Sequence, residues 1–154
     1  MSEFLNSGEE IKTHGDKLPH WQQGTVMQFV TFRLGDAMPA SKVEKWHEER
    51  KIWMNHHPDP WDDITRRKYH QRFTSQIEHW LDQGYGCCLF NDGGNRCELE
   101  KVIMCDHGSR ADYHAWVIMP NHVHLLFTPH HPLPKLISSW KSISARKIAT
   151  GSIW

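Results

Sequence analysis

The sequence lacks the features that assign a chain to the membrane, secreted or repeat classes. It has no apolar run of membrane-spanning length, no secretory signal, no internal repeat and no low-complexity segment. It has no Cys-x-x-Cys pair either, which argues against a redox motif or a zinc site. Its 154 residues suffice for one domain with a hydrophobic core. We therefore expect one cytoplasmic domain with reduced, mostly buried thiols at Cys87, Cys88, Cys97 and Cys105.

Acidic residues are absent from the end of the chain. The formal net charge is zero and argues neither for nor against nucleic acid. From Tyr113 to Trp154, however, there is no Asp or Glu, while Lys135, Lys141, Arg146 and Lys147 are present. A local basic surface would bind phosphate, with an attraction that weakens as salt rises. An ordinary solvated helix face explains the same charges equally well.

The most informative segment is a predicted β-hairpin over residues 113–127. Two apolar runs are separated by Pro120 and Asn121, a pair that favours a turn. His122 and His124 stand two apart in the second run, so a strand sends both imidazoles to one face. Two neighbouring histidines can hold one divalent metal ion. The alternative is a half-buried strand with two histidines on its polar face, since 13 histidines make chance pairs common.

Residues 114–126, HAWVIMPNHVHLL, resemble the signature of the REP-associated tyrosine transposases, a branch of the HUH (His-hydrophobic-His) transposases. The resemblance extends over about residues 19–154, with residues 1–18 expected to be a flexible tail. It implies an α+β, ferredoxin-like fold: an antiparallel sheet with the HUH motif on a central strand, and an inserted helical segment. It also implies that His122 and His124 bind Mg²⁺ or Mn²⁺, and that the partner is single-stranded DNA carrying a hairpin.

The sequence departs from this family at its end. Relatives continue past a Gly-x-x-Trp resembling residues 151–154 to a helix that carries a nucleophilic tyrosine and a further metal ligand. Tyr69, Tyr85 and Tyr113 are the tyrosines of this chain, and none matches that position. We therefore expect the fold and the metal pair to persist in a C-terminally incomplete domain, without a catalytic residue for strand cleavage. A missing edge strand would leave unpaired backbone groups and favour a homodimer.

By the same resemblance, Lys141 and Arg146 match basic positions of the helix after the HUH strand and are candidate DNA contacts. We interpret Pro120 and Asn121 as residues that shape the hairpin turn. Three other functions compete with the transposase: a non-catalytic DNA-hairpin-binding protein, a rolling-circle type of HUH endonuclease, and a metal-dependent hydrolase that uses water. The hydrolase lacks support, because no carboxylate follows Asp112 in the sequence to act as a base.

The remaining pattern predicts a strand over residues 25–34 and four helices. A capping box of Ser41 and Glu44 would begin the first helix, which ends near residue 55. Asp62 or Asp63 would cap the second, which runs to about residue 83. The third and fourth are expected over about residues 95–105 and 133–149. Core packing is the favoured role for Trp46, Trp53, Trp80 and Trp140, and base stacking is a hypothesis for Trp21.

Overall fold

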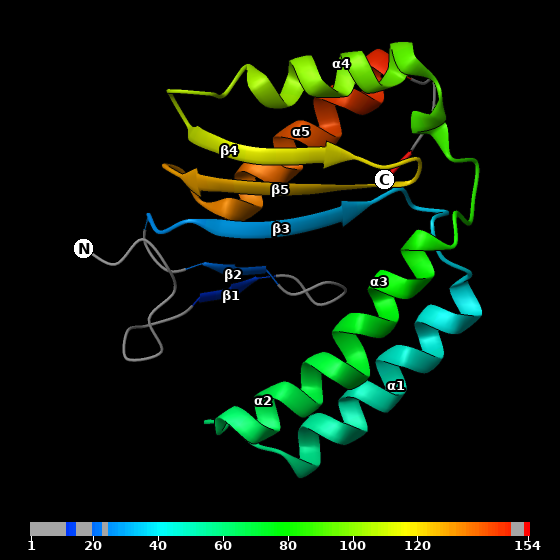
Figure 1. Cartoon of the computed structure of the whole chain (residues 1–154), viewed down its shortest axis with the longest axis vertical. Helices are drawn as coiled ribbons and strands as arrows, with labels where there is room; N and C mark the ends of the chain where they lie inside the picture. Colours follow the sequence, from blue (N-terminus) through cyan, green and yellow to red (C-terminus); the bar gives the residue numbers. More distant parts are fainter. Residues whose placement is uncertain (1–11, 15–19, 23–24, 149–152) are drawn as a thin grey trace.

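A computed structural model describes residues 12–14, 20–22, 25–148 and 153–154. The strands β3 (Gln28–Arg33), β4 (Ala111–Ile118) and β5 (His122–Pro129) form an antiparallel sheet in the order β3-β5-β4 (Figure 1). The predicted hairpin is therefore present, and the strand with both histidines lies at the centre of this sheet. The α+β class with an antiparallel sheet is confirmed.

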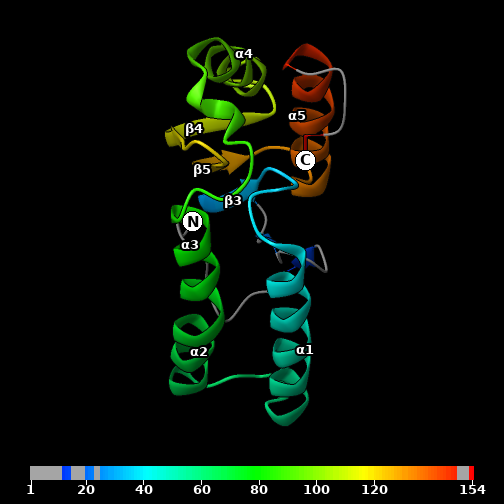
Figure 2. The same cartoon turned by 90° about the vertical axis from the view of Figure 1, so that its right-hand side faces the viewer.

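The helices α4 (Gly93–Met104) and α5 (Leu133–Ile148) pack on one face of the sheet (Figures 1 and 2). The alternation along β5 explains why: Val123, Leu125 and Phe127 are fully buried and point toward these helices. The indole of Trp140 on α5 packs against Phe127, with ring centroids 5.6 Å apart. Leu99, Val102 and Ile103 of α4 face inward as predicted.

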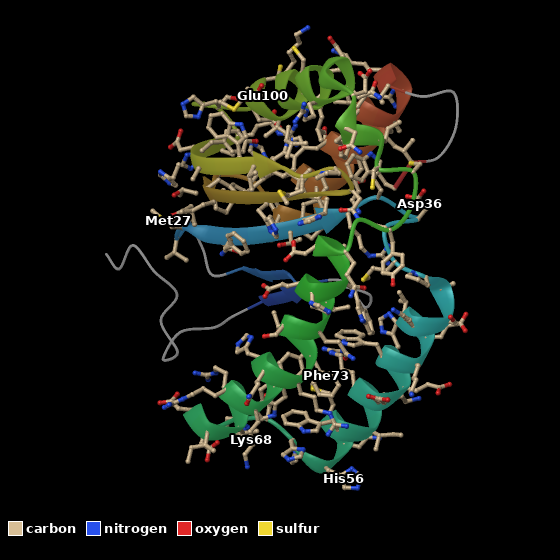
Figure 3. All side chains as sticks on the ribbon, turned by 45° about the vertical axis from the view of Figure 1, so that its right-hand side comes forward. Met27, Asp36, His56, Lys68, Phe73 and Glu100 are labelled. Atoms are coloured by element: carbon tan, nitrogen blue, oxygen red, sulfur yellow. The ribbon has the colours of Figure 1, made fainter. Side chains whose placement is uncertain are left out.

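A helical arm, residues 40–82, extends away from the sheet (Figures 1 and 2). It consists of α1 (Ala40–His56), α2 (Asp63–Tyr69), a π-helical turn (His70–Thr74) and α3 (Ser75–Asp82). Aromatic residues hold the arm together, because Trp46, Trp53 and Tyr69 all pack around Phe73, which lies between the helices in Figure 3. The arm contains the two helices that the sequence pattern predicts over about residues 41–55 and 62–83, the second of them interrupted by the π-helical turn.

The two ends of the arm meet beside the start of α1. The Asp36 carboxylate accepts a hydrogen bond from the backbone N–H of Cys87, with Oδ2 and N 2.7 Å apart. Between them Gly86 adopts a φ of +87°, and an added Cβ there would lie 2.6 Å from the backbone oxygen of Asp36. Only glycine combines that left-handed conformation with so close an approach. We call this contact between Asp36 and residues 86–87 the junction.

Helix starts differ from the sequence predictions in two places. The capping box is wrong: α1 begins after Pro39, and Ser41 lies within its first turn without a capping hydrogen bond. The start of α4 is also earlier than residue 95, because Asp92 Oδ1 accepts from the N–H of Asn95 at 2.9 Å and places Gly93 in the helix. Asp62 does cap α2 as predicted, accepting from the N–H of Thr65 at 2.7 Å.

The cysteines are not mostly buried, and this expectation is wrong. Cys87, Cys97 and Cys105 are exposed, and Cys88 is half-buried. Cys97 and Cys105 lie on the solvent side of the α4 region, since Leu99 and Ile103 occupy its core side. All four are free thiols.

Part of the expected tail has regular structure. Within residues 1–18, Lys12–His14 forms the strand β1, which pairs antiparallel with β2 (His20–Gln22). The flexible-tail expectation for residues 1–18 stays a prediction, because the rest of that segment lies outside the described residues.

None of the described helices is long and apolar enough to cross a membrane.

Candidate metal centre

The histidine pair lies on the face of the sheet that α4 and α5 do not cover. We call this the open face and define it by Phe29, Thr31 and Arg33 of β3 with His122, His124 and Leu126 of β5. Between the two histidines, Val123 points to the opposite face and is fully buried. Both imidazoles therefore leave β5 on one side, and their Nε2 atoms lie 3.0 Å apart.

Asn121 fixes the orientation of the His122 ring. Its side-chain Nδ2 donates to the backbone oxygen of Tyr85 at 3.0 Å, so its Oδ1 faces the His122 Nδ1 at 2.8 Å. An amide oxygen only accepts, and His122 Nδ1 must therefore carry the hydrogen. The lone pair of this imidazole is then on Nε2, directed at His124. Asn121 is 1% exposed and does more than shape the turn, which was the role inferred from the sequence.

Thr31 holds the second ring. Its hydroxyl oxygen lies 2.8 Å from His124 Nδ1, and a hydroxyl can donate or accept there. When the hydroxyl donates, His124 Nε2–H donates to His122. When it accepts, both Nε2 lone pairs converge on one point. Two ligands at right angles on an ion with bonds of 2.1 Å are about 3.0 Å apart, which is the spacing observed. The pair and its hydrogen-bonded supports therefore fit a divalent metal ion.

Burial favours the neutral form of both rings by lowering their pKa values. Desolvation, reinforced by the neighbouring His124, lowers the pKa of His122 to about 4, against a weaker opposing effect of Asp82. Burial also lowers the pKa of His124, while Glu78 and Asp82 oppose that change. A metal ion binds the neutral form of imidazole, so no proton has to be removed from His122 at neutral pH.

Two carboxylates of α3 stand near the pair. Asp82 Oδ1 lies 4.0 Å from His122 Nε2, and Glu78 is one helical turn earlier. The expectation that no carboxylate lies near the hairpin is wrong, because it considered only the sequence after Asp112. The spacing Glu78-x-x-x-Asp82 was the available signal. Among the described residues, no group of three or more His, Cys, Asp or Glu side chains is arranged to hold a metal ion.

The candidate DNA contacts do not lie beside the histidines. Lys141 and Arg146 belong to α5, on the covered face of the sheet. The Lys141 ammonium sits over the rings of Phe32 and Trp154, 6.0 Å and 5.7 Å from their centroids, and burial lowers its pKa. Arg146 is exposed and donates to the Ser142 hydroxyl at 2.9 Å. These basic residues therefore belong to the helix layer on the opposite side of the sheet from the histidine pair.

Sequence reasoning missed a basic cluster on the arm. Between Ile64 and Ile77 there is no Asp or Glu, whereas Arg66, Arg67, Lys68 and Arg72 are present. Lys68 lies at the far end of the arm in Figure 3. A count of charges along the sequence would have found this segment.

One aromatic side chain stands on the open face. Phe29 is 62% exposed, and its ring stacks on His124 with centroids 5.4 Å apart. Trp46, Trp53 and Trp140 are buried as predicted, and Trp80 is half-buried. The side chain of Trp21, the tryptophan singled out for stacking, lies outside what the structure describes.

In comparisons with known proteins, no family model, no curated protein and no solved structure matches this chain.

Proposed function

We propose that this chain is an HUH-type domain that binds a divalent metal ion, Mg²⁺ or Mn²⁺, and single-stranded DNA carrying a hairpin, in the manner of the REP-associated tyrosine transposases. One observation carries the proposal: His122 and His124 present Nε2 atoms 3.0 Å apart, with each Nδ1 held by a separate partner. Open positions on the ion would then polarise a phosphate oxygen of the DNA.

The order of elements supports the fold that this function needs. β3, the arm with α4, β4, β5 and α5 follow one another as strand, helices, strand, strand and helix. The ferredoxin-like order is β-α-β-β-α-β, of which this is the first part. The histidine pair lies on the central strand of the sheet, as in the HUH arrangement.

Support for a DNA partner comes from two surfaces. The exposed ring of Phe29 beside His124 is suited to stack a nucleobase, because every base has a flat apolar face. The basic cluster of the arm, Arg66 to Arg72, is suited to bind phosphates. The proposal covers binding and not strand cleavage. Tyr69 and Tyr113 are buried, and the Tyr85 hydroxyl accepts from Lys42 at 3.3 Å.

Titration calorimetry with Mn²⁺ tests the metal site. We expect one ion per chain, and we expect His124→Ala to weaken binding by more than about 100-fold, because the ion loses one of its nitrogen ligands. His114→Ala is the matched control: His114 is an exposed histidine of the same sheet, bonded to Thr128, and its removal should leave affinity unchanged. A wild-type chain that binds no Mn²⁺ would contradict the proposal.

Fluorescence anisotropy tests the DNA partner. We expect a labelled hairpin with a single-stranded extension to bind more tightly than a blunt duplex of the same sequence, and binding to weaken as salt rises. Binding that is unchanged by Mn²⁺ and by His124→Ala would favour the non-catalytic DNA-hairpin-binding protein. A denaturing gel of the same mixture should show no covalent protein–DNA adduct. An adduct would contradict the expected absence of strand cleavage.

Asp82 favours a second candidate, a metal-dependent phosphodiesterase with water as the nucleophile. Its carboxylate, 4.0 Å from His122 Nε2, is a possible base for a metal-bound water. Release of nitrophenol from bis(p-nitrophenyl) phosphate in the presence of Mn²⁺, lost in His124→Ala, would support this candidate. No release above the buffer rate would exclude it.

A further inference from the structure

We propose that Asp82 is the third protein ligand of the ion held by His122 and His124, so that the metal joins the helical arm to the sheet. This inference rests on the proposed metal site and deepens it. The ligands would be two imidazole nitrogens from β5 and one carboxylate oxygen from the last residue of α3. Three positions of a six-coordinate ion would remain for water or a phosphate oxygen.

The two distances measured from His122 satisfy the geometric limit on shared ligation. Two ligands of one ion cannot be further apart than twice the bond length, about 4.2 Å for bonds of 2.1 Å. The Asp82 Oδ1 atom lies 4.0 Å from His122 Nε2, inside this limit, and the two Nε2 atoms lie 3.0 Å apart. A movement of the Asp82 carboxylate toward the two Nε2 atoms would complete the set.

Asp82 is free to make that movement. Its side chain is 66% exposed, and His122 is its one recorded ion-pair partner among the described residues. It is the final residue of α3, the end of the arm that lies beside His122. A metal bond would therefore not have to displace a hydrogen bond of Asp82.

The charge balance also favours a carboxylate. Two neutral imidazoles leave the full charge of a divalent ion uncompensated, and one carboxylate removes half of it. Glu78 and Asp82 both act electrostatically on His124, with Glu78 the larger of the two effects, so a negative field reaches the place where the ion would bind. Glu78 stands one turn further back and has no recorded contact with His122. We assign it to the surrounding field rather than to the ligand set.

The ion would connect parts of the chain that are distant in sequence. Asp82 precedes the segment of Gly84 and Gly86, two glycines with positive φ that link the arm to the sheet. His122 follows 40 residues later. An ion bound by both Asp82 and His122 would restrict the motion of the arm at Gly84 and Gly86, where the backbone can adopt the widest range of conformations.

The experiment is Mn²⁺ titration of Asp82→Ala and Glu78→Ala, a matched pair of exposed carboxylates on one helix. We expect Asp82→Ala to weaken Mn²⁺ binding by at least about tenfold, and Glu78→Ala by less than about threefold, since loss of a ligand exceeds loss of a distant charge. In hydrogen exchange, Mn²⁺ should slow the amides of residues 83–88 in the wild type and not in Asp82→Ala.

The outcomes separate this inference from the proposed function. Wild type and Asp82→Ala with equal Mn²⁺ affinity would overturn the inference and leave the histidine site intact. Equal weakening by the two variants would also overturn it, because a general field would then explain both. Absence of Mn²⁺ binding by the wild type would remove the proposed site itself. Unfolding curves without metal check that Asp82→Ala remains folded, which the exposure of Asp82 predicts.

Discussion

The two faces of the sheet are made by alternate residues of the same strands, and they differ in nearly every property. On the covered face, Val123, Leu125 and Phe127 are fully buried against α4 and α5. On the open face, His122 and His124 alternate with them and make side-chain hydrogen bonds to Asn121 and Thr31. The first face stabilises the fold through apolar burial. The second orients nitrogen lone pairs.

The difference teaches how one strand serves two purposes. A residue of β5 that faces the helices cannot change without opening a cavity, whereas a residue that faces outward can be polar if its partners are fixed. The central position of β5 fixes its backbone, because its two edges are hydrogen-bonded to β3 and to β4. The histidines therefore project from the most constrained backbone of the sheet.

The adjacent residues Leu125 and Leu126 give the strongest test of this comparison. Leu125 is fully buried and Leu126 is half-buried on the open face. We expect Leu125→Ala to lower the free energy of unfolding by about 3 kcal/mol, because it leaves a cavity, and Leu126→Ala to lower it by less than about 1 kcal/mol. Urea denaturation measures both. Equal losses would show that another part of the chain covers the open face as tightly as α4 and α5 cover the other.

A substitution at the junction tests whether the contact between Asp36 and residues 86–87 stabilises the protein separately from the two faces of the sheet. Gly86→Ala should cost about 2 kcal/mol of stability, because the new Cβ meets the Asp36 backbone and a positive φ is strained for alanine. Gly93→Ala is the control: nothing lies within 4 Å of an added Cβ there, and Gly93 is helical. Its stability should stay the same or rise slightly. Thermal unfolding distinguishes the two, and equal melting temperatures would contradict the tight approach at Gly86.

Thr31 gives the smallest and most specific effect. Thr31→Val keeps the side-chain volume but removes the hydroxyl that orients His124, so Mn²⁺ binding should weaken about tenfold, or about 1.4 kcal/mol. Thr128→Val is its control, because Thr128 lies on the same face of β5 but bonds His114 instead. Unchanged affinity in Thr31→Val would mean that packing, and not this hydrogen bond, orients the ring.

The sequence predicted the elements whose signal is local. The period of two in β5 placed His122 and His124 on one face, and the spacing of Leu99, Val102 and Ile103 identified the inner side of α4. Helix starts were less predictable where two caps competed: Asp92 and Asn95 are both good capping residues, and the geometry of the preceding turn selected Asp92. The ferredoxin-like fold and the DNA partner stay predictions.

The parts of the site that the sequence did not reveal depend on contacts between distant segments. Asp82 lies beside His122 although the two residues are 40 positions apart in the sequence. Asn121 is held by the backbone oxygen of Tyr85, and a contact to the backbone cannot be predicted from the type of side chain at position 85. Lys141 was assigned to a DNA surface by its charge alone. Its position over Phe32 and Trp154 depends on how α5 packs, which residue spacing along one helix does not specify.

The closeness of Asp36 and Cys87 has a consequence for how this chain tolerates change. Because the arm leaves and returns at neighbouring points, residues 40–82 form a detour in the chain, and the pairing of β3, β5 and β4 involves none of them. The outer part of the arm, beyond the turn of α3 that holds Asp82, is therefore where we expect length to vary while the strands keep their register.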